Sequence, residues 1–231
     1  MPQQFLEGIK SVFFDAVGTL LHPARPVIET YGLIAQRHGM EIDQSLIRRR
    51  LHEAFQKQEY HDSQAEWKTS EEREADRWRQ IVCEALLESP NRDACFADLW
   101  EWYRHPKAWT AHPQTDSVLK ELTRRGLTVG MASNFDARLA AIVEAIPELK
   151  LLSVRCVISS VVGWRKPSRR FFDEVIQLAG CRAEQILFVG DDVRNDFEGA
   201  RDSGIRAVLL DPTGKSEVRE RIGTLVEVLE Q

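Results

Sequence analysis

Residues 11–23 read SVFFDAVGTLLHP, and this stretch is the starting point for predicting the fold. A short apolar run ends in one carboxylate, Asp15, and the chain then turns through Gly18 and Thr19. Many enzymes with this layout carry a second carboxylate two residues later, whereas this chain has Val17. The stretch therefore raises the question of what chemistry the first acid supports without the second.

Short apolar strands alternate with amphipathic helices over most of the chain. The predicted strands span 9–15, 127–133, 155–159, 185–190 and 206–210. The predicted helices between them span 115–125, 168–179 and 195–203. A glycine just after each helix supplies the left-handed residue that commonly ends one. Strands rich in β-branched residues and separated by helices indicate a parallel sheet with crossover connections. The predicted fold class is α/β, with a Rossmann-like, doubly wound parallel sheet.

The segment of residues 24–108 has helical periodicity and no convincing strand. Apolar residues recur at helical spacing in 27–38, 44–59, 70–88 and 93–104. A block this long exceeds an ordinary connection. We therefore expect an α/β core formed by 1–22 and 109–231, with an all-helical domain of residues 23–108 inserted after the first strand. Hinges are expected at 18–26 and 105–113.

The bulk properties disfavour several classes of partner. The net charge of −5 does not favour nucleic-acid binding. No apolar run approaches the ~18 residues that a membrane span needs, and the N-terminus lacks the apolar core of a secretory signal. The cysteines show neither a C-x-x-C pair nor zinc-site spacing; they are Cys83, Cys95, Cys156 and Cys181. We therefore expect a cytoplasmic protein with reduced thiols, monomeric or homodimeric, that binds neither nucleic acid nor membrane.

Polar side chains follow four of the predicted strands. In an open α/β sheet, ligands bind beyond the carboxyl ends of the strands, so these side chains are candidates for one site. In chain order they are Asp15, then Ser133 and Asn134, then Lys166 in the loop SVVGWRKPS, then Asp191 and Asp192, with Asn195 and Asp196 just beyond.

Together these groups suit magnesium-dependent chemistry on a phosphate group. Asp15, Asp191 and either Asp192 or Asp196 would converge, and like charges that close cannot all ionise unaided. A hard cation such as Mg²⁺ resolves that conflict. A serine hydroxyl and a lysine ammonium would hold the phosphate, which leaves Asp15 facing phosphorus as a nucleophile. Each residue alone is more often a turn former, a helix cap or an exposed side chain, so the prediction rests on their combination.

The chain resembles the haloacid dehalogenase (HAD) superfamily. The resemblance is carried by FFDAVGTLL, MASNFD, GWRKPSRRFF and FVGDDVRNDFEGAR, followed by SGIRAV, in matching order and spacing. The helical block after the first motif resembles an α-helical cap of type 1, at the first cap position of that family. SNFDARL and GWRKP are most similar to the branch of haloacid dehalogenase-like hydrolase domain-containing proteins.

The resemblance implies a role for each residue of the predicted site. Asp15 would be the nucleophile that forms an aspartyl intermediate, with Lys166 balancing charge on it and on the substrate phosphate. Ser133 would bind the transferring phosphoryl group. Asn134 would help to bind the substrate phosphate and would orient neighbouring groups or substrate. Mg²⁺ would be bound by Asp15, Asp191 and the backbone carbonyl of Val17. Asp192 or Asp196 would support the residues that bind the metal without binding it directly.

The departure from the family pattern is Val17, where phosphatases of the family usually have an aspartate that protonates the leaving oxygen. Loss of a general acid or base typically costs ~10²–10⁴ in rate. The first reading is a Mg²⁺-dependent phosphatase of a small phosphorylated metabolite with weakened proton transfer. It would favour good leaving groups, as in acyl or aryl phosphates, or borrow a proton from His22, His61 or Glu66.

Two other readings remain open from the residues. One is a dehalogenase or a phosphonatase, the latter requiring a Schiff-base lysine such as Lys57 or Lys68; neither lies in an apolar run that would lower its pKa. The other is a catalytically silent, regulatory protein that binds phosphate and Mg²⁺. Tryptophans are concentrated in and beside the helical segment: Trp67, Trp78, Trp100, Trp102 and Trp109. Those that are exposed would form the partner surface of such a protein.

Overall fold

A six-stranded parallel sheet forms the centre of the computed structural model, which describes residues 5–230. The strands lie in the order β5–β4–β1–β6–β7–β8. They span Ser11–Phe14 (β1), Thr128–Ser133 (β4), Cys156–Ile158 (β5), Ile186–Gly190 (β6), Arg206–Leu210 (β7) and Arg221–Ile222 (β8). The central strand β1 pairs with both β4 and β6, so Phe14 lies beside Met131 on one side and Val189 on the other. The predicted parallel α/β sheet is confirmed.

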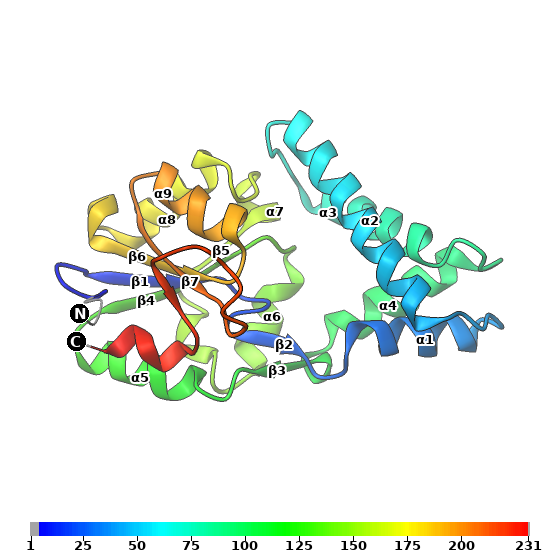
Figure 1. Cartoon of the computed structure of the whole chain (residues 1–231), viewed down its shortest axis with the longest axis horizontal. Helices are drawn as coiled ribbons and strands as arrows, with labels where there is room; N and C mark the ends of the chain where they lie inside the picture. The colour runs from blue at the N-terminus through cyan, green and yellow to red at the C-terminus, as the bar shows by residue number, and fades with distance from the viewer. Residues whose placement is uncertain (1–4, 231) are drawn as a thin grey trace.

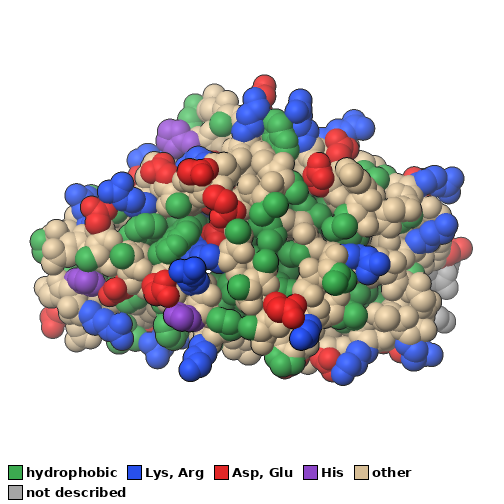
Figure 2. Space-filling model, turned by 180° about the vertical axis from the view of Figure 1, so that it is seen from behind, with side chains coloured by type: hydrophobic (Ala, Val, Ile, Leu, Met, Phe, Trp, Pro, Cys, Tyr) green, Lys and Arg blue, Asp and Glu red, His purple; other side chains and the backbone are tan. Residues whose placement is uncertain are grey.

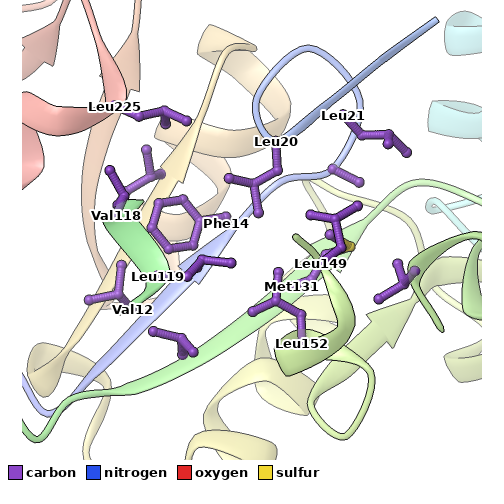
Figure 3. Close-up of a cluster of buried hydrophobic side chains, with 14 of the residues drawn as sticks. Val12, Phe14, Leu20, Leu21, Val118, Leu119, Met131, Leu149, Leu152 and Leu225 are labelled. Carbon is purple, nitrogen blue, oxygen red and sulfur yellow. The ribbon is translucent and has the colours of Figure 1, made fainter. Parts of the chain in front are cut away.

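Helices cover both faces of the sheet because successive strand residues point to opposite sides. Val12 and Phe14 of β1 pack into one hydrophobic cluster (Figure 3), and Phe13 packs into another. The first cluster includes residues of α5, α6 and the C-terminal 3₁₀ helix η5, and the second includes residues of α8 and α9 (Figure 1). These elements span Thr115–Arg124 (α5), Arg138–Ala145 (α6), Leu225–Leu229 (η5), Arg169–Ala179 (α8) and Gly199–Asp202 (α9). This arrangement is the doubly wound one that the sequence predicts.

Four further helices form a separate lobe beside the sheet, called here the helical block (residues 27–104; Figure 1). They span Val27–Arg37 (α1), Gln44–Gln64 (α2), Glu71–Ala85 (α3) and Arg92–Arg104 (α4). Their apolar faces meet in a hydrophobic cluster of their own, with Ile34, Ile47, Ile81 and Leu99 among its members. The block therefore has its own core, distinct from the two clusters that flank the sheet.

A two-stranded antiparallel ribbon joins the helical block to the sheet. Its strands, Leu21–Pro23 (β2) and Trp109–Ala111 (β3), bring His22 opposite Thr110. The sequence predicts hinges in this region but no strand. Strands of three residues are too short to show alternation, and their pairing depends on segments far apart in the sequence.

The helical block touches the core at a second place, through the connection between α2 and α3. The Arg165 N–H donates to the Trp67 carbonyl (2.8 Å), and the Thr69 N–H donates to the Gly163 carbonyl (3.0 Å). Trp67 has a positive φ of 63°, which turns the chain toward the loop that follows α7 (Ser159–Val162). We call this second attachment the latch.

Other differences from the predicted elements are local. Helix α2 continues to Gln64 instead of ending at 59, and α6 and β8 are not among the predicted elements. The helix predicted at 195–203 is a π-helix, η4 (Val193–Glu198), that continues as α9. The wider turn allows the Asp196 and Phe197 N–H groups both to reach the carbonyl of Asp192.

Charged side chains are scattered over the face seen in Figure 2, mostly toward its outline, and hydrophobic ones reach the surface near its middle. All four cysteines are free thiols, and Cys95 is buried. In the part of the chain that the structure describes, no helix combines the length and apolar character that a membrane crossing requires.

Candidate active site

The carboxyl ends of β1, β4 and β6 bring the predicted residues together. Asp15 follows β1, Ser133 ends β4, and Asp191 follows β6. Because β4 and β6 are the two neighbours of β1, their last residues meet around Asp15. The Ser133 hydroxyl donates to Asp15 Oδ1 over 3.1 Å. Adjacent parallel strands therefore place a carboxylate and a hydroxyl in direct contact.

Lys166 is the cation of the site, and its side chain is only 2% exposed. Its ammonium donates to Asp15 Oδ1 and to Asp196 Oδ1, both at 2.6 Å, and to the Ala132 carbonyl at 3.1 Å. All three donor positions of the ammonium are thus used within the protein. Lys166 joins the end of β1 to the π-helix after β6.

Asn134 holds the backbone of Lys166. Its side-chain amide donates to the Lys166 carbonyl (3.1 Å), and its Oδ1 accepts from the Lys166 N–H (2.8 Å). In this structure, therefore, Asn134 makes both of these bonds to the lysine loop and orients it. Of the roles that the resemblance implies for Asn134, these hydrogen bonds fit the orientation of a neighbouring group.

Three carboxylates form a compact acidic group. One oxygen each from Asp15, Asp191 and Asp196 lies within 4.8 Å of the other two. Two glycines permit this approach: a Cβ at Gly18 would lie 2.3 Å from Asp191 Oδ2, and one at Gly190 would lie 2.3 Å from Asp196. The Thr19 hydroxyl also donates to Asp191 Oδ1 (3.2 Å). Oxygen ligands at this spacing, in a space kept open by glycine, suit a small hard cation such as Mg²⁺.

Asp192 and Asp196 have different environments, although the sequence treats them as equivalent candidates. The Asp192 side chain accepts the Asn195 N–H (2.7 Å) and caps η4. Asp196 is buried, and its Oδ2 accepts the Asp192 N–H (3.1 Å). Within the residues that the structure describes, the acidic group contains Asp196 and not Asp192.

The site carries more negative than positive charge. Burial raises the pKa of Asp15 against the opposing effect of Lys166, and Asp191 raises it further. Burial and the charge of Asp196 raise the pKa of Asp191 to about 6, although its side chain keeps contact with solvent. Burial alone would lower the pKa of Lys166, but Asp15 and Asp196 together raise it. Three carboxylates against one ammonium leave a surplus that a divalent cation would neutralise.

A cavity of about 410 Å³ opens from these residues into the helical block. Asp15, Ser133 and Lys166 line one part of it, and residues of α1 to α4 line another. Val17 also lines it, half-buried beside the main core cluster. Glu59 of α2 is the carboxylate that the helical block contributes to this lining, and its Oε1 accepts from Asn195 Nδ2 (3.3 Å). Glu59 is not among the residues predicted from the sequence, where its signal is its position one helical turn after Phe55, another lining residue.

Several predicted donors lie elsewhere. His22, His61 and Glu66 are not among the described residues that line the cavity. The ring of His22 instead contacts that of His112, with centroids 5.7 Å apart, and burial lowers its pKa. Lys57 is paired with Glu84 and is more than half exposed.

Lys68 is also exposed. It pairs with Glu66 (3.2 Å) and lies 5.6 Å from the centre of the Trp164 ring. Neither Lys57 nor Lys68 lines the cavity among the described residues, so the structure offers no lysine of the helical block for a Schiff base there.

Comparison with known proteins gives a family match over most of the chain. Residues 9–204 match the haloacid dehalogenase-like hydrolase family. Human haloacid dehalogenase-like hydrolase domain-containing protein 3 is 27% identical over 224 residues, covering 91% of this chain and 87% of that protein. Phosphoserine phosphatase of Thermus thermophilus is 30% identical over 165 residues, covering 64% of this chain and 62% of that protein.

Solved structures share the fold. The HAD phosphatase from Thermococcus onnurineus has a TM-score of 0.66 at 21% identity, with 95% of this chain and 96% of that chain covered. Solved dehalogenases resemble the chain to a similar degree. The matched segment runs from the strand that presents Asp15, through the lysine loop, to the helix after Asp196, and on this ground the chain belongs to the haloacid dehalogenase-like hydrolase family.

Proposed function

We propose that this hydrolase is a Mg²⁺-dependent phosphatase that acts on a small phosphorylated metabolite through an aspartyl-phosphate intermediate. The observation that carries the proposal is the contact of Asp15 with both Lys166 and Ser133, beside the carboxylates of Asp191 and Asp196. The similarity to phosphoserine phosphatase supports phosphoester chemistry. We further infer a cytoplasmic protein, with residues 23–108 serving as a cap over a core formed by 1–22 and 109–231.

In the first step, Asp15 attacks phosphorus. Lys166 and Ser133 both donate to Oδ1 and fix the carboxylate, so Oδ2 is the attacking oxygen. When the phosphate binds, the Ser133 hydroxyl and the Lys166 ammonium also donate hydrogen bonds to the phosphate oxygens. The bond from phosphorus to the leaving oxygen breaks, and the leaving group departs with the electron pair. A water molecule then cleaves the acyl phosphate and regenerates Asp15.

Asp15, Asp191 and the carbonyl of Val17 would hold the metal, supported by Asp196. Bound there, Mg²⁺ would neutralise negative charge on the phosphate and the carboxylates. Asp196 keeps Lys166 in place through its 2.6 Å contact. Asp192, which caps η4, contributes through its backbone N–H to Asp196.

Val17 determines which substrates this site can serve. Its side chain lines the cavity but has no proton to give. The leaving group therefore departs as an anion, and the rate depends on how stable that anion is. We expect weak activity toward ordinary alkyl phosphates and better activity toward esters with good leaving groups.

The other readings have less support. A phosphonatase needs a lysine at the cavity, and Lys57 and Lys68 are exposed and paired elsewhere. A dehalogenase does not require the acidic group formed by Asp15, Asp191 and Asp196. A silent binding protein with the same pocket remains as the alternative that turnover would exclude.

The test is hydrolysis of acetyl phosphate and p-nitrophenyl phosphate, with Mg²⁺ and with a chelator. Wild type is compared with Asp15→Asn, which keeps the shape of the side chain and removes the nucleophile. Turnover that needs the metal and is lost in Asp15→Asn is the expected result. A folded wild-type protein that turns over neither compound would refute the proposal and favour the silent binding protein.

A further inference from the structure

The part of the cavity lined by the helical block and its neighbours is mainly aromatic. Its rings are arranged in touching pairs, with centroids 5.5 to 5.8 Å apart: Phe55 with Trp78, Phe96 with Trp100, and Trp109 with Phe135. Such edge and tilted contacts leave ring faces that are not stacked on another ring. The Arg138 guanidinium lies over the Trp100 ring, 3.4 Å from its centre, so a flat group there would use the other face of Trp100 or the neighbouring rings. Phe55, Trp78, Phe96 and Trp100 are only partly buried, so a ligand there would remove apolar surface from water.

The cations that line the cavity already have anionic partners. Arg138 makes two 2.7 Å bonds to Asp136. Arg77 donates to Asp62 at 2.9 Å, and Arg165 is bonded to Glu74. With Lys166 bound to Asp15 and Asp196, no described arginine or lysine of the lining lacks a carboxylate. A substrate with a second acidic group beyond its phosphate would find no free cation here.

Two buried polar atoms point to a ligand in the same cavity. Among the described residues, the Tyr103 hydroxyl and Asn195 Oδ1 are the buried side-chain oxygen or nitrogen atoms without a hydrogen-bond partner. Both residues line the cavity. Buried polar atoms are normally satisfied, so two unpaired atoms on residues that line one cavity are expected where a ligand or water completes the bonding. The site is therefore mostly apolar, with few polar contacts, as small-molecule sites usually are.

We infer that the substrate class is aryl phosphate monoesters, in which the phosphate is carried by the oxygen of an uncharged aromatic ring. The inference rests on the proposed phosphatase function and specifies the group that leaves. The aromatic wall would hold the ring, and Val17 would place an apolar side chain beside the leaving oxygen. The phosphoryl group passes from the ring oxygen to Asp15, and the ring leaves as a phenolate that takes its proton from solvent. A phenolate is stable enough to leave without a general acid, which is the group this site lacks.

Four substrates separate the two requirements. Phenyl phosphate has a ring and a good leaving group, benzyl phosphate has a ring and a poor one, acetyl phosphate has only the good leaving group, and ethyl phosphate has neither. We expect phenyl phosphate and benzyl phosphate to have similar KM values, each at least about tenfold below that of ethyl phosphate. Of these three substrates, only the first two carry a ring that can pack against the aromatic side chains of the cavity. We expect kcat for phenyl phosphate to exceed that for benzyl phosphate by about 10² or more.

Matched tryptophan variants locate the effect. Trp78→Leu and Trp100→Leu remove rings of the cavity wall, and each should reduce the ratio of kcat/KM for phenyl phosphate to that for acetyl phosphate about tenfold. Trp102→Leu is the control, because Trp102 lies on the same helix as Trp100 but not on the cavity. Two wall variants are used so that one which fails to fold leaves the other to decide.

The outcomes distinguish the two proposals. If acetyl phosphate is hydrolysed but ring substrates gain no KM advantage, the inference fails and the phosphatase proposal stands. If no ester is turned over, the phosphatase proposal fails. Binding of phenylphosphonic acid, followed by tryptophan fluorescence, then tests the cavity separately. Saturable binding that Trp100→Leu weakens and Trp102→Leu does not would support an aryl site, and its absence would overturn one.

Discussion

Asp62→Asn tests the buried ion network that links the helical block to the core. The Asp62 side chain is fully buried; it accepts from Arg73 (2.7 Å) and Arg77 (2.9 Å), and Arg165 Nε lies 3.5 Å away. Arg165 is the core residue just before Lys166 and also contacts Glu74. The substitution keeps one acceptor oxygen but removes the charge, which leaves Arg77 with the more distant carboxylates of Glu59, at 3.9 Å, and Glu74.

The expected cost follows from that geometry. Removing one partner from a buried ion network costs about 3–5 kcal/mol, because the remaining charge is buried without compensation. Since the asparagine can still accept a hydrogen bond, we expect the lower end, about 3 kcal/mol. For a chain of this size that corresponds to a fall in Tm of roughly 6–12 °C.

Urea unfolding followed by circular dichroism measures this cost, and hydrolysis of acetyl phosphate at 25 °C shows whether the neighbouring site is affected. Asp116→Asn is the matched control, since Asp116 pairs with Lys120 on the surface of α5, where the side chains are 47% and 73% exposed. It should change the free energy of unfolding by less than about 0.5 kcal/mol. A loss below about 1 kcal/mol in Asp62→Asn would show that the network contributes little to stability.

Three further predictions address the site. Val17→Asp should raise kcat for benzyl phosphate by about 10² or more and change phenyl phosphate much less, because only the alkyl ester needs a proton donor; no gain in a folded, Mg²⁺-binding variant would contradict this. Since the pKa of Asp191 is raised to about 6, its carboxylate is protonated below that pH. Mg²⁺ affinity, measured by calorimetry, should therefore be constant above pH 7 and fall about tenfold per unit below about pH 6, and a flat profile would exclude Asp191 as a ligand. Gly18→Ala places a Cβ 2.3 Å from Asp191 at a φ of +101°, so it should weaken Mg²⁺ binding about tenfold or more. Gly39→Ala, with φ +76° and no atom within 4 Å of the added Cβ, should cost stability without changing metal affinity.

The sheet and the cluster around Asp15 were predictable because they follow from local patterns. Apolar runs mark strands, and in a parallel sheet the residues after neighbouring strands must meet. That reasoning brings Asp15, Ser133 and Asp191 together without knowledge of any distance. It also includes Lys166, because its loop follows another strand of the sheet and its charge complements the carboxylates at the other strand ends.

Features that depend on distant pairs could not be predicted in the same way. The β2–β3 ribbon joins segments on either side of the helical block, and three-residue strands leave no pattern. The choice between Asp192 and Asp196 is made by a π-helix, which the helical period does not reveal. Glu59 and the aromatic side chains of the cavity can be recognised only once α2, α3 and α4 are placed beside the sheet, because their spacing in the sequence equally fits ordinary core positions.

The latch also bears on how such a protein could change its specificity. The helical block is joined to the core through the two short strands of the ribbon, and such a simple connection would allow the block to be exchanged between related proteins. At the latch, however, Arg165 carries its charge into the helical block and depends on Asp62 and Glu74 there. A block taken from a protein without those two carboxylates would leave the Arg165 guanidinium without an ion-pair partner, next to Lys166 in the sequence. Interchange of the two parts therefore requires residue 165 and its acidic partners to move together.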